Sequence, residues 1–104
     1  MTNTARLEEL LTEATVDCYG LEEEFMGILY TLVDNLNFPL VATALGEPVD
    51  VIGLDDNRSS PSRGILATVR KGDREYQLAL SELEFTAPDP VSAEWLAMYH
   101  YWLG

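Results

Sequence analysis

The chain has little cysteine, histidine or basic side chain, and each shortage excludes a class of function. Its single cysteine, Cys18, cannot form an internal disulfide, so we expect a protein of the reducing cytoplasm. Cys18 and the single histidine, His100, are too few for a zinc or other transition-metal site. Six basic against 18 acidic residues give a net charge of -12. We therefore expect no nucleic-acid partner, which needs a basic footprint, and no docking on anionic membranes.

Long apolar runs and glycine clusters are also absent. No stretch approaches the ~18 apolar residues of a membrane span, and no basic-then-apolar leader opens the sequence. The seven glycines are scattered, so they form no phosphate-binding loop. Cys18 and His100 are the only nucleophile–base pair available, and no motif supplies them with an orienting partner or an oxyanion hole. We therefore expect that the protein is not an enzyme.

The length and the hydrophobic pattern predict one α+β domain spanning residues 1–104. A chain of this length, 47% apolar, can bury roughly two-thirds of its unfolded surface in one core. The pattern predicts two N-terminal helices, a small antiparallel β-sheet or SH3-like barrel of four to five strands, and a C-terminal helix. The predicted helices are residues 5–15, capped by Thr4, residues 21–36, and a last helix capped by Asp89 and opened by Pro90. The predicted strands are residues 38–42, 49–54, 65–70 and 74–80, with a polar loop at 55–64 and a short helical turn at 81–83 that leads into residues 84–85.

The acidic residues are concentrated in one half of the sequence. From Leu7 to Asn57 there are twelve Asp and Glu residues and no Lys or Arg, whereas the remainder carries six acids and all six bases. Like charges without counterparts repel one another in the folded state. The imbalance therefore indicates either a surface kept acidic for solubility or a surface that a bound cation completes.

Two clusters of carboxylates could bind a hard cation such as calcium, which takes about six to eight oxygen ligands. Neither is an EF-hand: counted from Asp55, the sixth position is Ser60 instead of Gly and the twelfth is Leu66 instead of Glu. The first cluster joins the link between the first two helices to one face of the second helix. Its candidate ligands are Asp17, Glu23, Glu24, Asp34 and Asn35. The second cluster comprises Asp50, Asp55 and Asp56.

Each cluster also has an ordinary structural explanation. Acidic residues favour a helix N-terminus because of the helix dipole, and the second cluster is typical of a solvated turn with Arg58 and Arg63 nearby. Gly27 favours the first cluster, because it lies on the polar helix face, where glycine costs about 1 kcal/mol relative to alanine. We therefore expect another segment to approach the backbone at Gly27 and to cover part of this acidic face.

The region of the first cluster resembles a known family, the cyanobacterial calcium-binding proteins of the CcbP family. The similarity is densest over residues 16–39, where the segments VDCY (16–19) and LVDNLNFP (32–39) enclose Glu24 and Gly27. It continues in GEPV (46–49), LSEL (80–83) and YHYW (99–102), and so spans nearly the whole chain. The resemblance implies a small acidic cytoplasmic protein that binds calcium without an EF-hand and helps to set its free level. In filamentous cyanobacteria, it also implies a link to heterocyst differentiation.

The resemblance implies Asp17, Glu24 and Asp34 as the calcium ligands that match the family. The leading prediction is a calcium buffer or sensor with Ca²⁺ as its ligand. The alternative is an acidic interaction module that binds a basic partner, a regulatory protein of unknown identity, through the β-barrel or the aromatic C-terminal helix. Because about three helix turns separate Glu24 from Asp34, we expect these acids to belong to at least two sites, or one end to recruit oxygens from elsewhere, such as the loop at 50–57.

Overall fold

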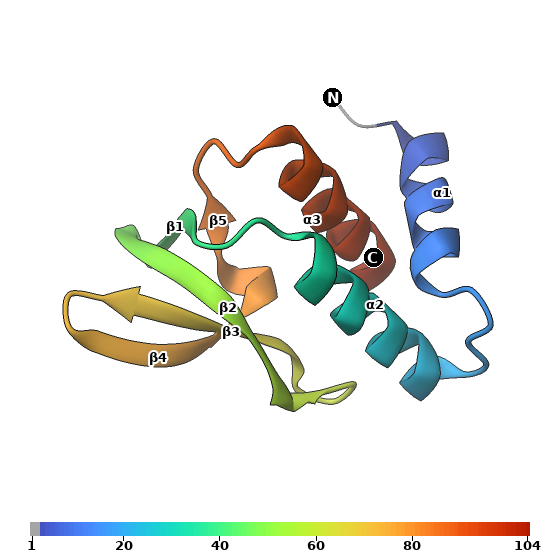
Figure 1. Ribbon diagram of the computed structural model, residues 1–104, viewed down its shortest axis with the longest axis horizontal. Helices are drawn as coiled ribbons and strands as arrows, with labels where there is room; N and C mark the ends of the chain where they lie inside the picture. The colour runs from blue at the N-terminus through green and yellow to red at the C-terminus, as the bar shows by residue number, and fades with distance from the viewer. Residues whose placement is uncertain (1–2) are drawn as a thin grey trace. The chain divides into compact units, whose positions relative to one another are not determined.

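The computed structural model describes residues 3–104, which form three α-helices and a five-stranded antiparallel sheet (Figure 1). They divide into two compact units: a helical unit, made of residues up to Leu36 together with Asp89–Gly104, and a sheet unit, Asn37–Pro88. The α+β prediction is confirmed, and the expectation of a single domain stays a prediction. Along the chain the elements are α1 (Thr4–Ala14), α2 (Leu21–Asn35), β1 (Leu40–Ala44), β2 (Glu47–Ser60), β3 (Gly64–Lys71), β4 (Arg74–Ala79), η1 (Leu80–Glu82), β5 (Glu84–Phe85) and α3 (Pro90–Leu103).

The first and last helices begin where short polar side chains cap their free N–H groups. Asn3 Oδ1 accepts from the backbone N–H of Arg6 at 2.9 Å, so Asn3 caps α1, one residue before the predicted Thr4. Asp89 caps α3 as predicted: its Oδ2 accepts from the backbone N–H of Ser92 at 3.0 Å, and a proline opens the helix. Within residues 3–104, no helix has the length and apolar character needed to cross a membrane.

Polar contacts join α1 to α3, which lie side by side in the helical unit (Figure 1). Arg6 Nε and Nη2 donate to the Glu94 carboxylate at 3.2 and 3.3 Å, and these hydrogen bonds raise the pKa of Arg6. The Tyr101 hydroxyl donates to Glu8 Oε1 at 2.9 Å, which raises the pKa of Tyr101. Exposed pairs of this kind contribute little stability each. The stability of the unit therefore depends mainly on its apolar packing.

Aromatic side chains from α2 and α3 form part of that packing. The ring centroid of Trp102 lies 6.4 Å from that of Phe25 and 6.4 Å from that of Tyr99. Phe25, Tyr99 and Trp95 are buried, and the ring separations fall in the range that favours aromatic pairs. Most of the aromatic face of α3 is thus occupied in packing, which weighs against this helix as a surface for a partner.

Gly27 lets the end of α1 approach the backbone of α2. A Cβ atom on Gly27 would lie 2.6 Å from the carbonyl oxygen of Ala14 and 3.0 Å from Cys18 Sγ. The predicted close approach at Gly27 is therefore confirmed. It covers little of the acidic face, however, because Glu23 is exposed and Glu24 is half-buried.

The sheet unit is an open antiparallel sheet with the strand order β4-β3-β2-β1-β5 (Figure 1). Of the two predicted arrangements, the open sheet is present and the barrel is not. Alternate residues of β3 are fully buried, namely Ile65, Ala67 and Val69, which gives the sheet one apolar face.

The predicted polar loop at residues 55–64 is wrong over most of its length, because β2 continues to Ser60. The register of β2 against β3 shifts between Asp55 and Ser60. Such a bulge accommodates extra residues without ending the strand, and solvent-facing positions tolerate polar side chains. Polarity alone therefore did not mark the end of the strand.

Replacing Gly27 by alanine should destabilise the helical unit. Overpacking against a backbone carbonyl costs about 1–3 kcal/mol or more, which exceeds the helix propensity of ~1 kcal/mol that alanine adds. We expect the free energy of unfolding to fall by about 1–2 kcal/mol in a urea titration. Gly53→Ala is the matched control, because a Cβ at Gly53 meets nothing within 4 Å. Equal stability of the two variants would contradict the close-approach argument.

Candidate functional site

The link between α1 and α2 places Asp17 on the surface. Thr15 ends α1 by donating from its backbone N–H and its hydroxyl to the carbonyl of Leu11, at 3.0 and 2.8 Å. The N–H of Cys18 then returns to the Thr15 carbonyl at 3.0 Å. Between them Asp17 adopts the left-handed conformation, φ 60°, which aspartate tolerates better than most residues. Its carboxylate is therefore exposed at the turn.

Three glutamates occupy the first turn of α2, where the helix dipole favours negative charge. Glu23 Oε1 accepts from the backbone N–H of Tyr19 at 3.1 Å and so satisfies a donor just before the helix. Gly20, the cap residue, supplies no side-chain acceptor of its own. Glu23 thus has a structural role, and its second carboxylate oxygen has no recorded partner within residues 3–104. Glu22 and Glu24 make no such contact among these residues.

Asp34 and Asn35 lie at the opposite end of α2. The Asn35 amide nitrogen donates to the carbonyl of Thr31 at 2.8 Å, which leaves its amide oxygen as a possible ligand. Asp34 is exposed, and the last turn contains no basic residue. At 1.5 Å per residue, the ten residues from Glu24 to Asp34 correspond to about 15 Å along the helix axis. One ion with ligands at about 2.3–2.6 Å cannot bind both residues.

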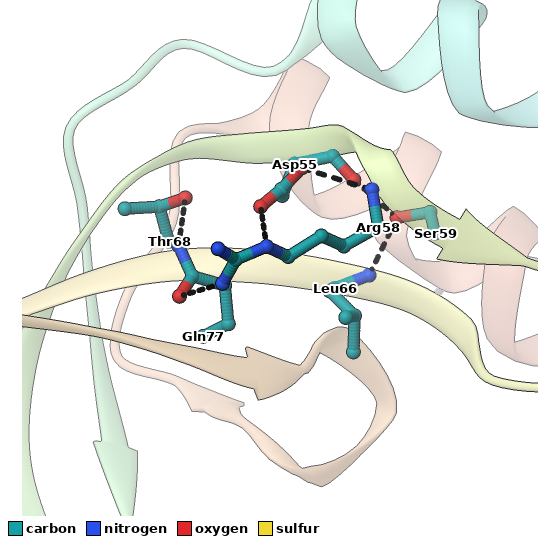
Figure 2. Close-up of polar contacts among 6 residues, drawn as sticks. All are labelled: Asp55, Arg58, Ser59, Leu66, Thr68 and Gln77. Carbon is teal, nitrogen blue, oxygen red and sulfur yellow. Dashed lines mark hydrogen bonds and ion pairs between the residues drawn. The ribbon is translucent and has the colours of Figure 1, made fainter.

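Asp55, from the second predicted cluster, belongs to a polar network in the sheet (Figure 2). Its Oδ1 accepts from the backbone N–H of Arg58 at 3.0 Å, and its Oδ2 lies 3.7 Å from Arg58 Nε. Arg58 Nη1 also donates to Gln77 Oε1 at 3.1 Å, and the Gln77 amide nitrogen donates to the Thr68 hydroxyl at 3.4 Å. The carboxylate of Asp55 is thus already paired with a cation and a backbone donor.

Ser59 completes the bulge beside Asp55. Its hydroxyl donates to the Asp55 carbonyl at 2.6 Å and accepts from the backbone N–H of Leu66 at 2.8 Å (Figure 2). The hydroxyl therefore connects β2 and β3 where the register shifts and the regular ladder is interrupted. Asp55, Arg58 and Ser59 together hold the bulge closed.

Asp50 and Asp56, the other acids of the second cluster, are exposed. Asp50 lies opposite Arg70 in the β2–β3 register and lines a hollow of about 180 Å³ together with Arg70 and Lys71. Lys71 pairs with Glu47, and this contact lowers the pKa of Glu47. Nearby cations repel a metal ion, so this surface fits calcium less well than the helical unit does.

The helical unit has the excess of negative charge. Ten acidic residues face a single basic one, Arg6, which gives this unit a net charge of -9. Arg6 already pairs with Glu94. Among residues 3–104, the side chains of Asp17, Glu24 and Asp34 have no hydrogen bond or ion pair. These oxygen ligands fit a hard cation.

The predicted ligands do not converge on one point. In the part of the chain that the structure describes, no three or more His, Cys, Asp or Glu side chains are grouped so as to hold a metal ion. The structure thus places the first cluster at two ends of one helix and the second cluster beside basic residues.

Sequence analysis missed one feature of the α1–α2 link, a hollow of about 650 Å³. Its rim contains acidic side chains and the exposed apolar residues Tyr19 and Leu21. No sequence pattern marked it, because the exposure of Tyr19 in the link and of Leu21 in the first turn of α2 depends on the fold and not on residue type.

Comparisons with known proteins relate the whole chain to one family. Residues 8–103 match the CcbP family model, which is described as calcium binding. The crystal structure of Anabaena CcbP shares 27% identity, with a TM-score of 0.82 over 99% of this chain and 92% of that one. A calcium-binding protein in its calcium-binding form shares 28% identity, with a TM-score of 0.80 over 97% of this chain and 90% of that one. A search of curated proteins finds no match.

The family match covers nearly the whole chain and agrees with the resemblance carried by residues 16–39. The two solved structures contain the same fold over almost all of both chains. The chain therefore belongs to the CcbP family of calcium-binding proteins.

Proposed function

We propose that this protein binds calcium ions through carboxylates of its helical unit and thereby buffers or senses free calcium. One observation carries the proposal: Asp17, Glu24 and Asp34 have no partner within residues 3–104, in a unit whose single basic residue is already paired. These like charges repel one another, and a bound cation relieves that repulsion and so lowers the free energy of the folded state. The family membership supports calcium as the cation.

Two sites suit the geometry of α2 better than one. Asp17 and Glu24, with Glu23, would serve a site at the N-terminal end, and Asp34 with the Asn35 amide oxygen would serve a site at the C-terminal end. Neither end supplies six oxygens from side chains alone. Backbone carbonyls and water would complete each coordination shell, as is usual for calcium outside EF-hands.

The setting and the absence of catalysis are parts of the same proposal. The proposed setting is the cytoplasm, with a role in cyanobacterial calcium signalling that includes heterocyst differentiation, as the sequence resemblance over residues 16–39 implies. No catalytic step is proposed, since calcium binding by carboxylates requires no nucleophile or general base. Asp50, Asp55 and Asp56 remain the reserve candidates for a site in the sheet unit.

Calcium should stabilise the folded protein. It binds carboxylates that are clustered in the folded chain and dispersed in the unfolded one, and linkage gives about 2.7 kcal/mol per site at a hundredfold excess over Kd. Calorimetric titration should show saturable binding, and the melting temperature should rise with calcium and fall again with chelator. Magnesium should stabilise less, because it gives up its waters reluctantly. Equal binding of the two ions would indicate a diffuse ion atmosphere and refute the proposal.

Neutralising either end of α2 should remove part of the calcium capacity. In Asp17→Asn, Glu24→Gln and Asp34→Asn, we expect weaker calcium binding together with equal or higher stability without calcium, because repulsion is relieved. For Glu24, in the first turn of α2, a helix-dipole role would instead cost stability with and without calcium. Each variant is titrated with calcium and melted in chelator.

The matched control is Glu13→Gln, which removes one charge from the same unit at an exposed position of α1. It should relieve repulsion and leave the number of bound ions unchanged. Wild-type affinity and stoichiometry in all three ligand variants would transfer the site to Asp50, Asp55 and Asp56.

Asp55 should act in folding and not in calcium binding. Asp55→Ala removes the acceptor for the Arg58 N–H, so we expect a loss of about 1 kcal/mol in the free energy of unfolding. Asp56→Ala, at the exposed neighbouring position, should change it by less than about 0.5 kcal/mol. Both variants should bind calcium as the wild type does, measured by calorimetry. A lower stoichiometry in Asp55→Ala would restore the sheet cluster as a site.

A further inference from the structure

The hollow at the α1–α2 link has properties that calcium binding does not use. Its volume is about 650 Å³, and it is wide open to solvent. Sites for small molecules usually enclose most of the ligand surface, so an open hollow suits the side chains of a protein segment better. It is lined by Cys18, Tyr19, Gly20, Leu21, Glu22, Glu23 and Met26.

Large apolar side chains at this hollow are exposed to water. Among the residues that line the hollow, Tyr19 is 79% exposed and Leu21 62%, and Val16, in the same link but outside the lining, is 65% exposed. Tyr30, 52% exposed, follows Met26 by four residues on α2 and therefore lies on the same helix face. Apolar side chains gathered on a surface and rimmed by polar ones are typical of protein-interaction sites.

The ionisable rim of the hollow is acidic. Glu22 and Glu23 line it, and Asp17 lies in the adjoining link. The single basic residue of the helical unit, Arg6, is paired with Glu94 on α3. An apolar hollow with a negative rim complements a segment that carries apolar side chains among positive ones.

We propose that this surface docks a positively charged amphipathic segment of another protein. We call it the corner surface and define it by Tyr19, Leu21, Glu22, Glu23, Met26 and Tyr30. Apolar side chains of the partner enter the hollow, while its lysines and arginines face the two glutamates. The proposal goes beyond calcium binding and does not rest on it, so it is tested in chelator.

The probe is a fluorescein-labelled peptide of about 14 residues, with leucine at one helical face and lysine elsewhere. Its anisotropy is followed with the full chain at about 0.15 M salt, where exposed charges are partly screened. A second peptide has serine in place of each leucine and the same number of lysines. We expect the leucine peptide to bind at least about tenfold more tightly, because its apolar side chains are buried. Equal binding of the two peptides would show that overall charge alone attracts them, and it would overturn the proposal.

Substitutions then localise the binding. Leu21→Ser and Tyr30→Ser should each weaken binding of the leucine peptide about tenfold, whereas Val91→Ser, an exposed change on α3, should leave it unchanged. Glu22→Gln with Glu23→Gln should weaken binding and reduce its salt dependence more than Glu82→Gln with Glu84→Gln does. Glutamine at position 23 retains an acceptor for the Tyr19 N–H.

Circular dichroism confirms that each variant is folded before binding is measured. Unchanged binding in both Leu21→Ser and Tyr30→Ser, or equal loss in Val91→Ser, overturns the corner surface as the docking site. Calcium calorimetry on Leu21→Ser and Tyr30→Ser, which change no proposed calcium ligand, reports the calcium sites independently, so failure of one proposal is not read as failure of the other.

Discussion

The 2.6 Å separation between the Ala14 carbonyl oxygen and the position of a Cβ on Gly27 constrains the helical unit of this protein. Only glycine permits that approach without a shift of the backbone. The approach leaves a short link between the two helices, Thr15–Gly20, in which Asp17 takes a left-handed conformation and Tyr19 remains in water. The position of the Asp17 carboxylate and the shape of the hollow thus depend on residue 27 being a glycine, which has no Cβ atom.

Charge is the second constraint, and it acts against packing. Bringing ten acids and one base into one helical unit raises the free energy of the folded state through repulsion. Buried aromatic and aliphatic side chains, Phe25 and Tyr99 among them, offset that cost. The surface acids without partners among residues 3–104 are available to ligands. The carboxylate of Asp55, in contrast, is already paired with Arg58 in the bulge.

The parts of the fold that sequence could predict are those set by local patterns. Helical periodicity, the start of α3 at Asp89-Pro90 and the β3–β4 hairpin each depend on residues that are close to one another in the sequence. The length of β2 was not predictable in this way, because its polar end is held by the backbone of Leu66 in the next strand and by Gln77, 19 residues from Arg58. Gly27 shows the reverse case: its place on a polar face was enough to predict a close neighbour, although not that the neighbour would be Ala14.

The grouping of the acids was less predictable than their identity, and the helix dipole explains why the two ends of α2 are not equivalent. At the N-terminal end the three glutamates lie beside the positive pole of the helix, and Glu23 accepts a backbone hydrogen bond. At the C-terminal end Asp34 faces the negative pole, and the last turn has no basic residue to compensate for it. A cation beside Asp34 therefore offsets both a side-chain charge and a backbone charge. A cation at the first turn instead has to approach the positive pole. Equal numbers of carboxylates at the two ends would thus not give equal affinities for a cation, and a count of acids along the sequence cannot rank the two ends.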